Sequence, residues 1–187
     1  MIKRLTEALA WAKRIEDERG AAFIELALCL PVLFVLVFGV IEFSQIIYDN
    51  QMMSGLSRQG SNLASRGWPL ADTPTEIGVV SALVTQGASL NIGTRGRIIV
   101  TEVEKNIKTG KLEIVGQQES PTGIPATSAI NPWITKPASV PSNARTVLNA
   151  GQTIFVTEVF YSYVPITPLG GFLKMKLAST LYDAAYF

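Results

Sequence analysis

The sequence predicts an α+β protein, in which a long N-terminal transmembrane helix continues into a small antiparallel sheet. Three observations predict it: an uncharged apolar run over residues 26–41, apolar positions at helical spacing as far as Arg66, and β-rich alternating segments beyond residue 96. The 187 residues leave room for one domain plus an anchor. We therefore expect a leader over residues 1–20, a helix over 21–67 and a globular α+β domain over 68–187.

The apolar run is long enough to approach the thickness of a membrane. Residues 26–41 hold no charge, and the apolar character continues past Glu42 to Ile47. The uncharged run spans roughly 24 Å at about 1.5 Å per residue, so Glu25 and Glu42 lie near the edges of a hydrocarbon layer roughly 30 Å thick. We predict a transmembrane segment at about residues 25–47. A buried core helix and a cleaved secretory signal are the alternatives, but residues 41–45 offer no small-x-small cleavage site.

Charge around the run predicts its orientation. Basic residues precede it five times, and only Arg58 and Arg66 occur in the twenty residues after Tyr48. The positive-inside rule then places the N-terminus in the cytoplasm and the C-terminal domain in the periplasm. The single cysteine, Cys29, cannot form an internal disulfide and is interpreted as a small apolar side chain of the span.

The junction between leader and span carries an unusual carboxylate. A charged leader ends at Gly20, and Glu25 follows at the edge of the apolar run, where an unpaired carboxylate is costly. If a peptidase cut after Gly20, the new amino group of Ala21 would lie one helical turn from Glu25, or near the Glu25 of a neighbouring subunit. The alternative is a plain interfacial Glu25, with Gly20 as the C-cap of a short helix.

At this point the sequence resembles a known family. The string RGAAFIELALCLPVLFVLVFGVIEF resembles the class III signal of type IV prepilins and, more narrowly, the TadE-like minor pilins of tight-adherence (Tad, type IVc) pili. The segment YSYVPITPLGGF is similar to the tyrosine-proline turn near the end of many TadE-like domains. Leu26 and Val40 depart from the family pattern. The helix positions that match it are Ala27, Pro31, Gly39, Glu42 and Phe43.

The resemblance implies a function in assembly. It implies a minor pilin or pseudopilin, cut by a prepilin peptidase between Gly20 and Ala21, that acts in pilus assembly, initiation or tip structure for adhesion. The implied partners are that peptidase, other major and minor pilins, the assembly platform of the bacterial inner membrane, and membrane lipid. The implied location is the inner membrane, with incorporation into the extracellular pilus as a further step.

Composition argues against other functions. The 16 basic and 15 acidic residues nearly balance, so no electrostatic case for nucleic acid arises. Histidine is absent, which removes the commonest general base and metal ligand, and we expect no enzyme activity, metal or cofactor. The alternative function is a single-pass membrane protein whose periplasmic domain binds a partner or ligand unrelated to pili. A membrane-anchored enzyme is a third and less favoured class.

Beyond the span, apolar positions continue at helical spacing, and we expect Asp49, Asn50, Arg58 and Asn62 to lie largely on the other side of the helix. Thr73-Pro74-Thr75-Glu76 predicts the capped start of a second helix with Ile77, Val80 and Val84 on one face.

Strands are predicted over residues 97–105 and 111–117, joined by a turn at 106–110, and again over residues 153–163 and around 173–178. Glu102 and Glu104 are expected on a solvated face. The segment 93–96 is interpreted as a turn. Five prolines between residues 119 and 149 predict a loop that is not a core element, with Trp133 either packed on the domain or in contact with a partner subunit.

Overall fold

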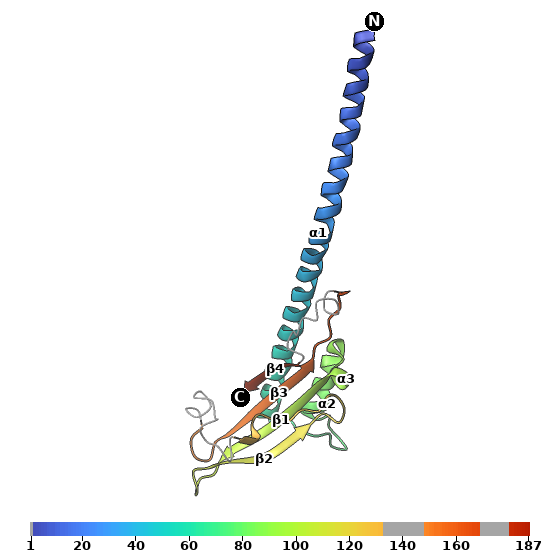
Figure 1. The fold of residues 1–187 in the computed structure, drawn as a ribbon. Coiled ribbons are helices and arrows are strands. Elements are labelled where there is room, and N and C mark those ends of the chain that lie inside the picture. The colour runs from blue at the N-terminus through green and yellow to red at the C-terminus, as the bar shows by residue number, and fades with distance from the viewer. Residues whose placement is uncertain (1, 133–147, 169–179) are drawn as a thin grey trace. The chain divides into compact units, whose positions relative to one another are not determined.

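The computed structural model describes residues 2–132, 148–168 and 180–187, and only the backbone of residues 2–19 (Figure 1). The chain divides into two compact units. We call Met1–Ser44 with Pro165–Met175 the anchor unit, and Gln45–Val164 with Lys176–Phe187 the sheet unit. The predicted α+β class, with a long apolar N-terminal helix followed by a small antiparallel sheet, is confirmed.

Helix α1 runs from Ile2 to Ser65 with Pro31 inside it. Its end lies close to the predicted one, because Gly67 adopts a left-handed conformation (φ 84°) and its amide donates to the carbonyl of Ala64. Its start differs from the prediction. The helix continues through Gly20 and begins at Ile2, so the predicted leader is helical as well.

The sheet unit contains four antiparallel strands in the order β2-β1-β3-β4. Their bounds are β1 Gly96–Lys105, β2 Leu112–Glu119, β3 Thr153–Ser162 and β4 Thr180–Tyr186. The predicted hairpin is present, and the side-chain oxygen of Asn106 accepts bonds from the amides of Lys108 (2.8 Å) and Thr109 (3.1 Å) in its turn. β1 and β3 are the central strands, which explains why they are the most buried.

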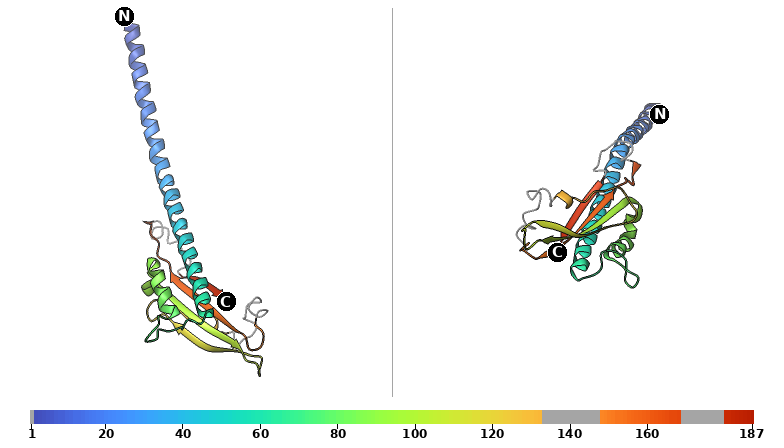
Figure 2. Two further views of the ribbon diagram at one scale, coloured as in Figure 1. Left: turned by 180° about the vertical axis from the view of Figure 1, so that it is seen from behind. Right: turned by 90° about the horizontal axis from the view of Figure 1, so that it is seen from below.

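One face of the sheet packs against helices. The sheet-unit part of α1 and helix α2 (Val79–Gln86) lie on this face in two views (Figures 1 and 2). A 3-10 helix, Gly87–Leu90, and a single turn, α3 (Ile92–Arg95), lead into β1. The main core lies here and includes Met53, Leu56, Leu83, Ile98, Val100 and Val159.

The opposite face carries a second, smaller core. It is formed by Val103, Ile130, Leu148, Ile154 and Val156. Ile130 and Leu148 come from the proline-rich segment, so the prediction that this segment contributes no core element was wrong for these two residues. The physical reason is that the described helices leave this apolar sheet face uncovered, and irregular chain buries it instead.

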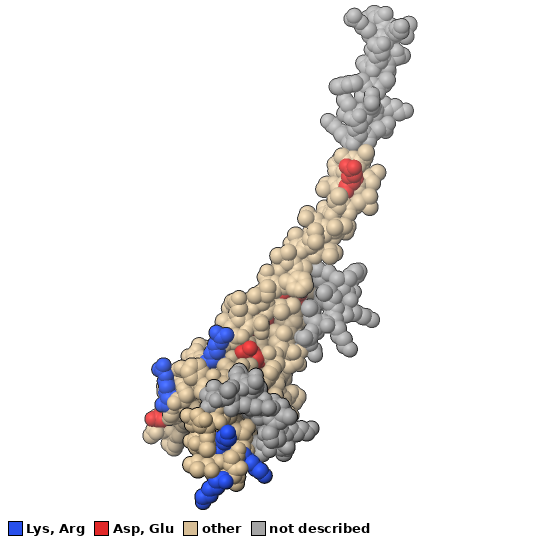
Figure 3. Space-filling model, turned by 90° about the vertical axis from the view of Figure 1, so that its left-hand side faces the viewer, with Lys and Arg blue, Asp and Glu red and all other residues tan. Residues whose placement is uncertain are grey.

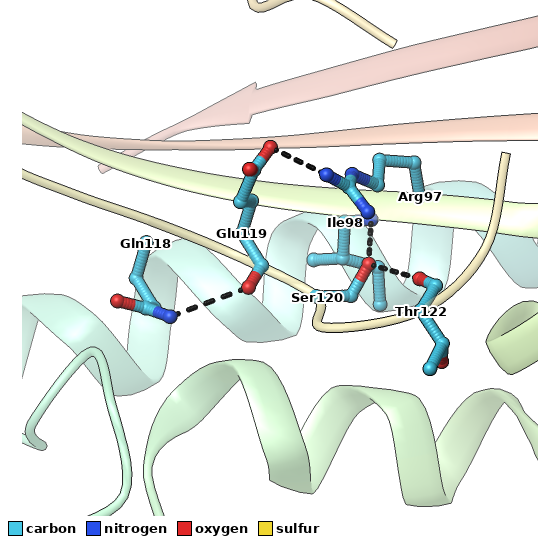
Figure 4. Close-up of polar contacts among 6 residues, drawn as sticks. All are labelled: Arg97, Ile98, Gln118, Glu119, Ser120 and Thr122. Carbon is cyan, nitrogen blue, oxygen red and sulfur yellow. Dashed lines mark hydrogen bonds and ion pairs between the residues drawn. The ribbon is translucent and has the colours of Figure 1, made fainter. Parts of the chain in front are cut away.

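The chain enters this second layer through a tight turn after β2 (Figure 4). Arg97 and Glu119 form an ion pair at 2.9 Å, and the Ser120 hydroxyl accepts from the Ile98 amide and donates to the Thr122 carbonyl. Gly123 follows at φ 118°, where a Cβ would overlap the carbonyl oxygen of Gly96. Only glycine fits this close approach of two backbones.

The second predicted helix exists, but its start was wrong. The Thr73 hydroxyl accepts from the Glu76 amide at 3.0 Å, as a capping box would, yet these residues form a bend and the helix begins at Val79. The Asp72 carboxylate instead accepts from the Gly78 amide (2.7 Å) and the Ser81 hydroxyl (2.8 Å). Ile77 is consequently exposed.

Three further predictions concern the segment 93–96, the last strand and Trp133. The segment 93–96 was interpreted as a turn; residues 93–95 belong to α3, a single helical turn, and Gly96 is the first residue of β1. β4 was missed, because Leu181 and Asp183 share one face of the strand and so break the apolar-polar alternation that marks a strand in a sequence. Trp133 and residues 173–178, where a strand was expected, lie outside the described residues.

Candidate functional site

The anchor part of α1 exposes apolar side chains in every direction. Phe23, Leu28 and Val40 are 74%, 70% and 67% exposed, and Phe34 stacks on Phe38 with ring centroids 6.0 Å apart. Figure 3 shows this stretch as almost entirely uncharged surface. Within the described residues, one helix is long and apolar enough to cross a membrane, and none of its apolar window is buried. A helix that is apolar all round suits lipid better than water.

Gly20 and Ala21 lie exposed on this helix, and Glu25 follows one turn after Ala21. A Cβ on Gly20 would meet no described atom within 4 Å, so packing within the chain does not require a glycine there. In the intact chain the nitrogen of Ala21 is a peptide amide. A pair between its amino group and Glu25 therefore requires cleavage.

The other motif positions fall into two groups. Ala27, Pro31 and Phe43 are exposed, and Gly39 is half-buried with open space around its missing Cβ. Glu42 differs, because it is only 6% exposed. Four of the five positions thus make few demands on the packing of a single chain.

The Glu42 carboxylate binds a residue from the other end of the sequence. Its Oε2 accepts a bond from the backbone amide of Thr167 (3.0 Å) and another from the Thr167 hydroxyl (2.7 Å). Both residues belong to the anchor unit. The apolar-helix motif and the tyrosine-proline turn therefore meet here. Thr167 was not predicted from the sequence, although the cost of a carboxylate beside an apolar run indicated that Glu42 needed a partner.

The sheet-unit part of α1 buries polar side chains. Asp49, expected away from the apolar side, is 2% exposed and accepts from the Gln45 side chain at 2.8 Å. Burial raises the pKa of the Asp49 carboxyl, against the opposing effects of the Gln45 bond and the Arg95 charge. Ser57 donates to Asp183, and the Ser61 hydroxyl bridges the Thr157 amide and the Ala185 carbonyl. These contacts fasten α1 to β3 and β4.

On the second sheet face, β3 buries Glu158 at 0% exposure. Its carboxylate accepts from the Ser128 hydroxyl, the Ala129 amide (2.8 Å) and the Tyr182 hydroxyl (3.0 Å). Burial raises the pKa of this carboxyl, although each of the three bonds lowers it. Glu158 joins β4 to the segment around Ser128, and its three partners are typical of a structural carboxylate. Within the described residues, no three metal-ligating side chains gather.

Comparison with known proteins points to the same N-terminal segment. Residues 20–62 match the family model described as TadE-like protein. No curated protein and no solved structure gives a match. The match begins at Gly20 and includes Glu25, the apolar run and Glu42, so it coincides with the part of the chain on which the resemblance was recognised. Over this segment the resemblance to TadE-like proteins of Tad pilus systems is confirmed.

Proposed function

We propose that this chain is a minor pilin or pseudopilin of a Tad-type type IV pilus, which is cut by a prepilin peptidase and acts in pilus assembly, initiation or tip structure. In this proposal residues 1–20 are a cytoplasmic leader, residues at about 25–47 cross the inner membrane, and residues 68–187 form the periplasmic domain. Its partners are the peptidase, other pilins, the assembly platform and membrane lipid.

The proposal rests on one observation: the family match begins at the predicted cleavage site. The family match begins at Gly20, the last residue of the predicted leader, and the exposed apolar helix follows directly. The exposure of Gly20 and Ala21 supports access by a peptidase, but their helical backbone would have to open locally before the bond could be cut.

After cleavage, the amino group of Ala21 becomes a cation next to the apolar span. A carboxylate one turn away, in the same chain or a neighbouring one, would compensate that charge where water is scarce, and such a pair is worth more there than on an exposed surface. Glu25 is the residue at this place. We propose that it pairs with the new amine during assembly.

N-terminal sequencing of the protein from cells that contain an active prepilin peptidase tests the cleavage. We expect chains that begin at Ala21, and we expect Gly20→Val to stop the cut without disturbing the fold, since the space around Gly20 is open. Recovery of chains that all begin at Met1 would contradict the proposal. It would favour the alternative, a single-pass membrane protein with a partner- or ligand-binding domain unrelated to pili.

Glu25→Gln tests the pairing separately from the cleavage. The amide keeps the shape but removes the charge, so the mature form should persist while co-purification with pilus components falls. Glu76→Gln, which changes an exposed glutamate of the sheet unit, is the matched control and should alter neither. If Glu25→Gln and this control both assembled at the wild-type level, no amine-carboxylate pair would be needed.

A further inference from the structure

The anchor unit contains a short segment that lies beside α1 where the apolar run ends. Thr167 donates its backbone amide and its hydroxyl to Glu42, and Glu42 directly follows the uncharged residues 26–41. The contact therefore fixes residues 165–168 at the level of the helix that is the expected exit of the span.

The length of the run places this level at the lipid boundary. The uncharged run covers roughly 24 Å, and the hydrocarbon layer is roughly 30 Å thick, so the layer reaches beyond the run at one end or both. Phe43, Ile47 and Tyr48 remain 57%, 57% and 50% exposed after Glu42. An apolar surface thus continues past the carboxylate, and the two bonds from Thr167 reduce the cost of holding that carboxylate near lipid.

The segment combines few free backbone donors with an exposed apolar side chain. Pro165 and Pro168 have no backbone N–H, and the N–H of Thr167 is bonded to Glu42. Among the four residues, the remaining backbone donor is the N–H of Ile166, so few donors of this segment need an acceptor from water. The Ile166 side chain is 59% exposed.

We infer that residues 165–168 form a second contact with the membrane, in which Ile166 enters the boundary between headgroups and acyl chains while Glu42 holds the segment in place. The partner is a lipid surface, because the segment lies at the end of the candidate span and continues its apolar surface. This inference rests on the proposed membrane anchoring. Glu42 acts as a positioning residue, since it reaches the lipid contact through Thr167.

Depth-dependent fluorescence quenching tests the inference on the full chain. Cys29 is the single cysteine, so one environment-sensitive probe can be placed at Cys29, at position 166 through Cys29→Ser with Ile166→Cys, or at position 108 through Cys29→Ser with Lys108→Cys. The chains are inserted into vesicles of phosphatidylethanolamine and phosphatidylglycerol that carry nitroxide-labelled lipid. We expect the probes at 29 and 166 to be quenched several-fold more than the probe at 108, an exposed turn of the sheet unit.

The outcomes separate this inference from the proposed function. Quenching at 29 without quenching at 166 would overturn the lipid contact and leave the anchoring intact, whereas an absence of quenching at both would remove the anchoring as well. A probe at 166 that is shielded only at high protein density, and loses the shielding when lipid is added, would show contact with a second copy of the chain and would also overturn the inference.

Two variants of Glu42 test whether this residue positions the segment. Glu42→Ala removes the acceptor for Thr167 and should lower the quenching at 166 toward that at 108, while quenching at 29 is unchanged. Glu42→Gln retains a side-chain oxygen and should restore most of the quenching. If Glu42→Ala left quenching at 166 at its original level, Glu42 would not position the segment.

Discussion

Two stretches of α1 differ in what they expose and what they bury. Residues 20–41 expose phenylalanine, leucine and valine on all sides, whereas residues 45–65 bury Ser57, Ser61 and Asp49 along with Met53 and Leu56. One backbone geometry serves two environments, because a helix satisfies its own amides and carbonyls wherever it lies. The side chains alone decide the environment. The second stretch can bury polar groups because strands and neighbouring side chains offer them partners.

A matched pair of leucines provides the largest test of this difference. Leu56 is 2% exposed in the main core, and Leu33 is 59% exposed in the apolar stretch of α1. Leu56→Ala should lower the free energy of unfolding of the sheet unit by about 2–5 kcal/mol, through lost burial and a cavity. Leu33→Ala should leave it unchanged. Thermal unfolding of the full chain in micelles, followed by tryptophan fluorescence, measures both, and similar losses from the two variants would contradict the division of α1.

Two glycines in residues 45–65 of α1 sharpen the comparison, because alanine at these two positions should change the free energy of unfolding in opposite directions. A Cβ on Gly60 would lie 2.6 Å from Leu83 and 2.7 Å from the Thr157 side chain, whereas a Cβ on Gly55 would meet nothing within 4 Å. Gly60→Ala should therefore destabilise the sheet unit by roughly 1–2 kcal/mol through overpacking. Gly55→Ala should stabilise it by roughly 0.5–1 kcal/mol, since alanine loses less backbone freedom in a helix. The same unfolding measurement decides, and a stabilising Gly60→Ala would show that Gly60 is not a contact point.

The sequence predicted the features that depend on neighbouring residues along the chain. The uncharged run, the helical spacing up to Arg66 and the hairpin around Asn106 are local patterns, and the structure contains each of them. The family segment was recognised from the same kind of local signal, and the match over residues 20–62 confirms it. The cleavage at Gly20 and the role of Glu25 stay predictions, because both concern events outside the single intact chain.

The sequence did not predict contacts between distant residues. Glu42 and Thr167 are 125 positions apart, and no local pattern pairs them. Asp49 was predicted on the wrong side of the helix, because a prediction from helical spacing assigns carboxylates to the solvent-exposed side. In the structure, the Gln45 hydrogen bond and the Arg95 charge offset part of the cost of burying the Asp49 carboxylate. The start of α2 was misplaced for a related reason. Asp72 reaches the Gly78 amide across six residues, which a four-residue capping pattern does not describe.

Glu25 and Glu158 differ in the same way as these two stretches of α1. Glu25, in the apolar stretch of α1, is exposed, whereas Glu158 is buried with three hydrogen-bond donors. The titratable groups that face Glu158 are Tyr182, whose hydroxyl binds it, and Tyr186, with Asp183 nearby on β4. Burial nevertheless outweighs the donors and raises the pKa of Glu158 above its ordinary value of 4.5.

The smallest predicted effect follows from this raised pKa. The folded chain holds the proton of Glu158 more tightly than the unfolded chain does, so the stabilisation from the protonated form is complete below pH 4.5 and is lost as the pH rises through the raised value. We therefore expect the sheet unit to lose stability from this group as the pH rises above 4.5. Glu158→Gln should flatten that part of the profile, while the exposed Glu76→Gln should retain it. Unfolding midpoints measured across this range provide the check, and an unchanged slope in Glu158→Gln would show that Glu158 does not titrate with folding.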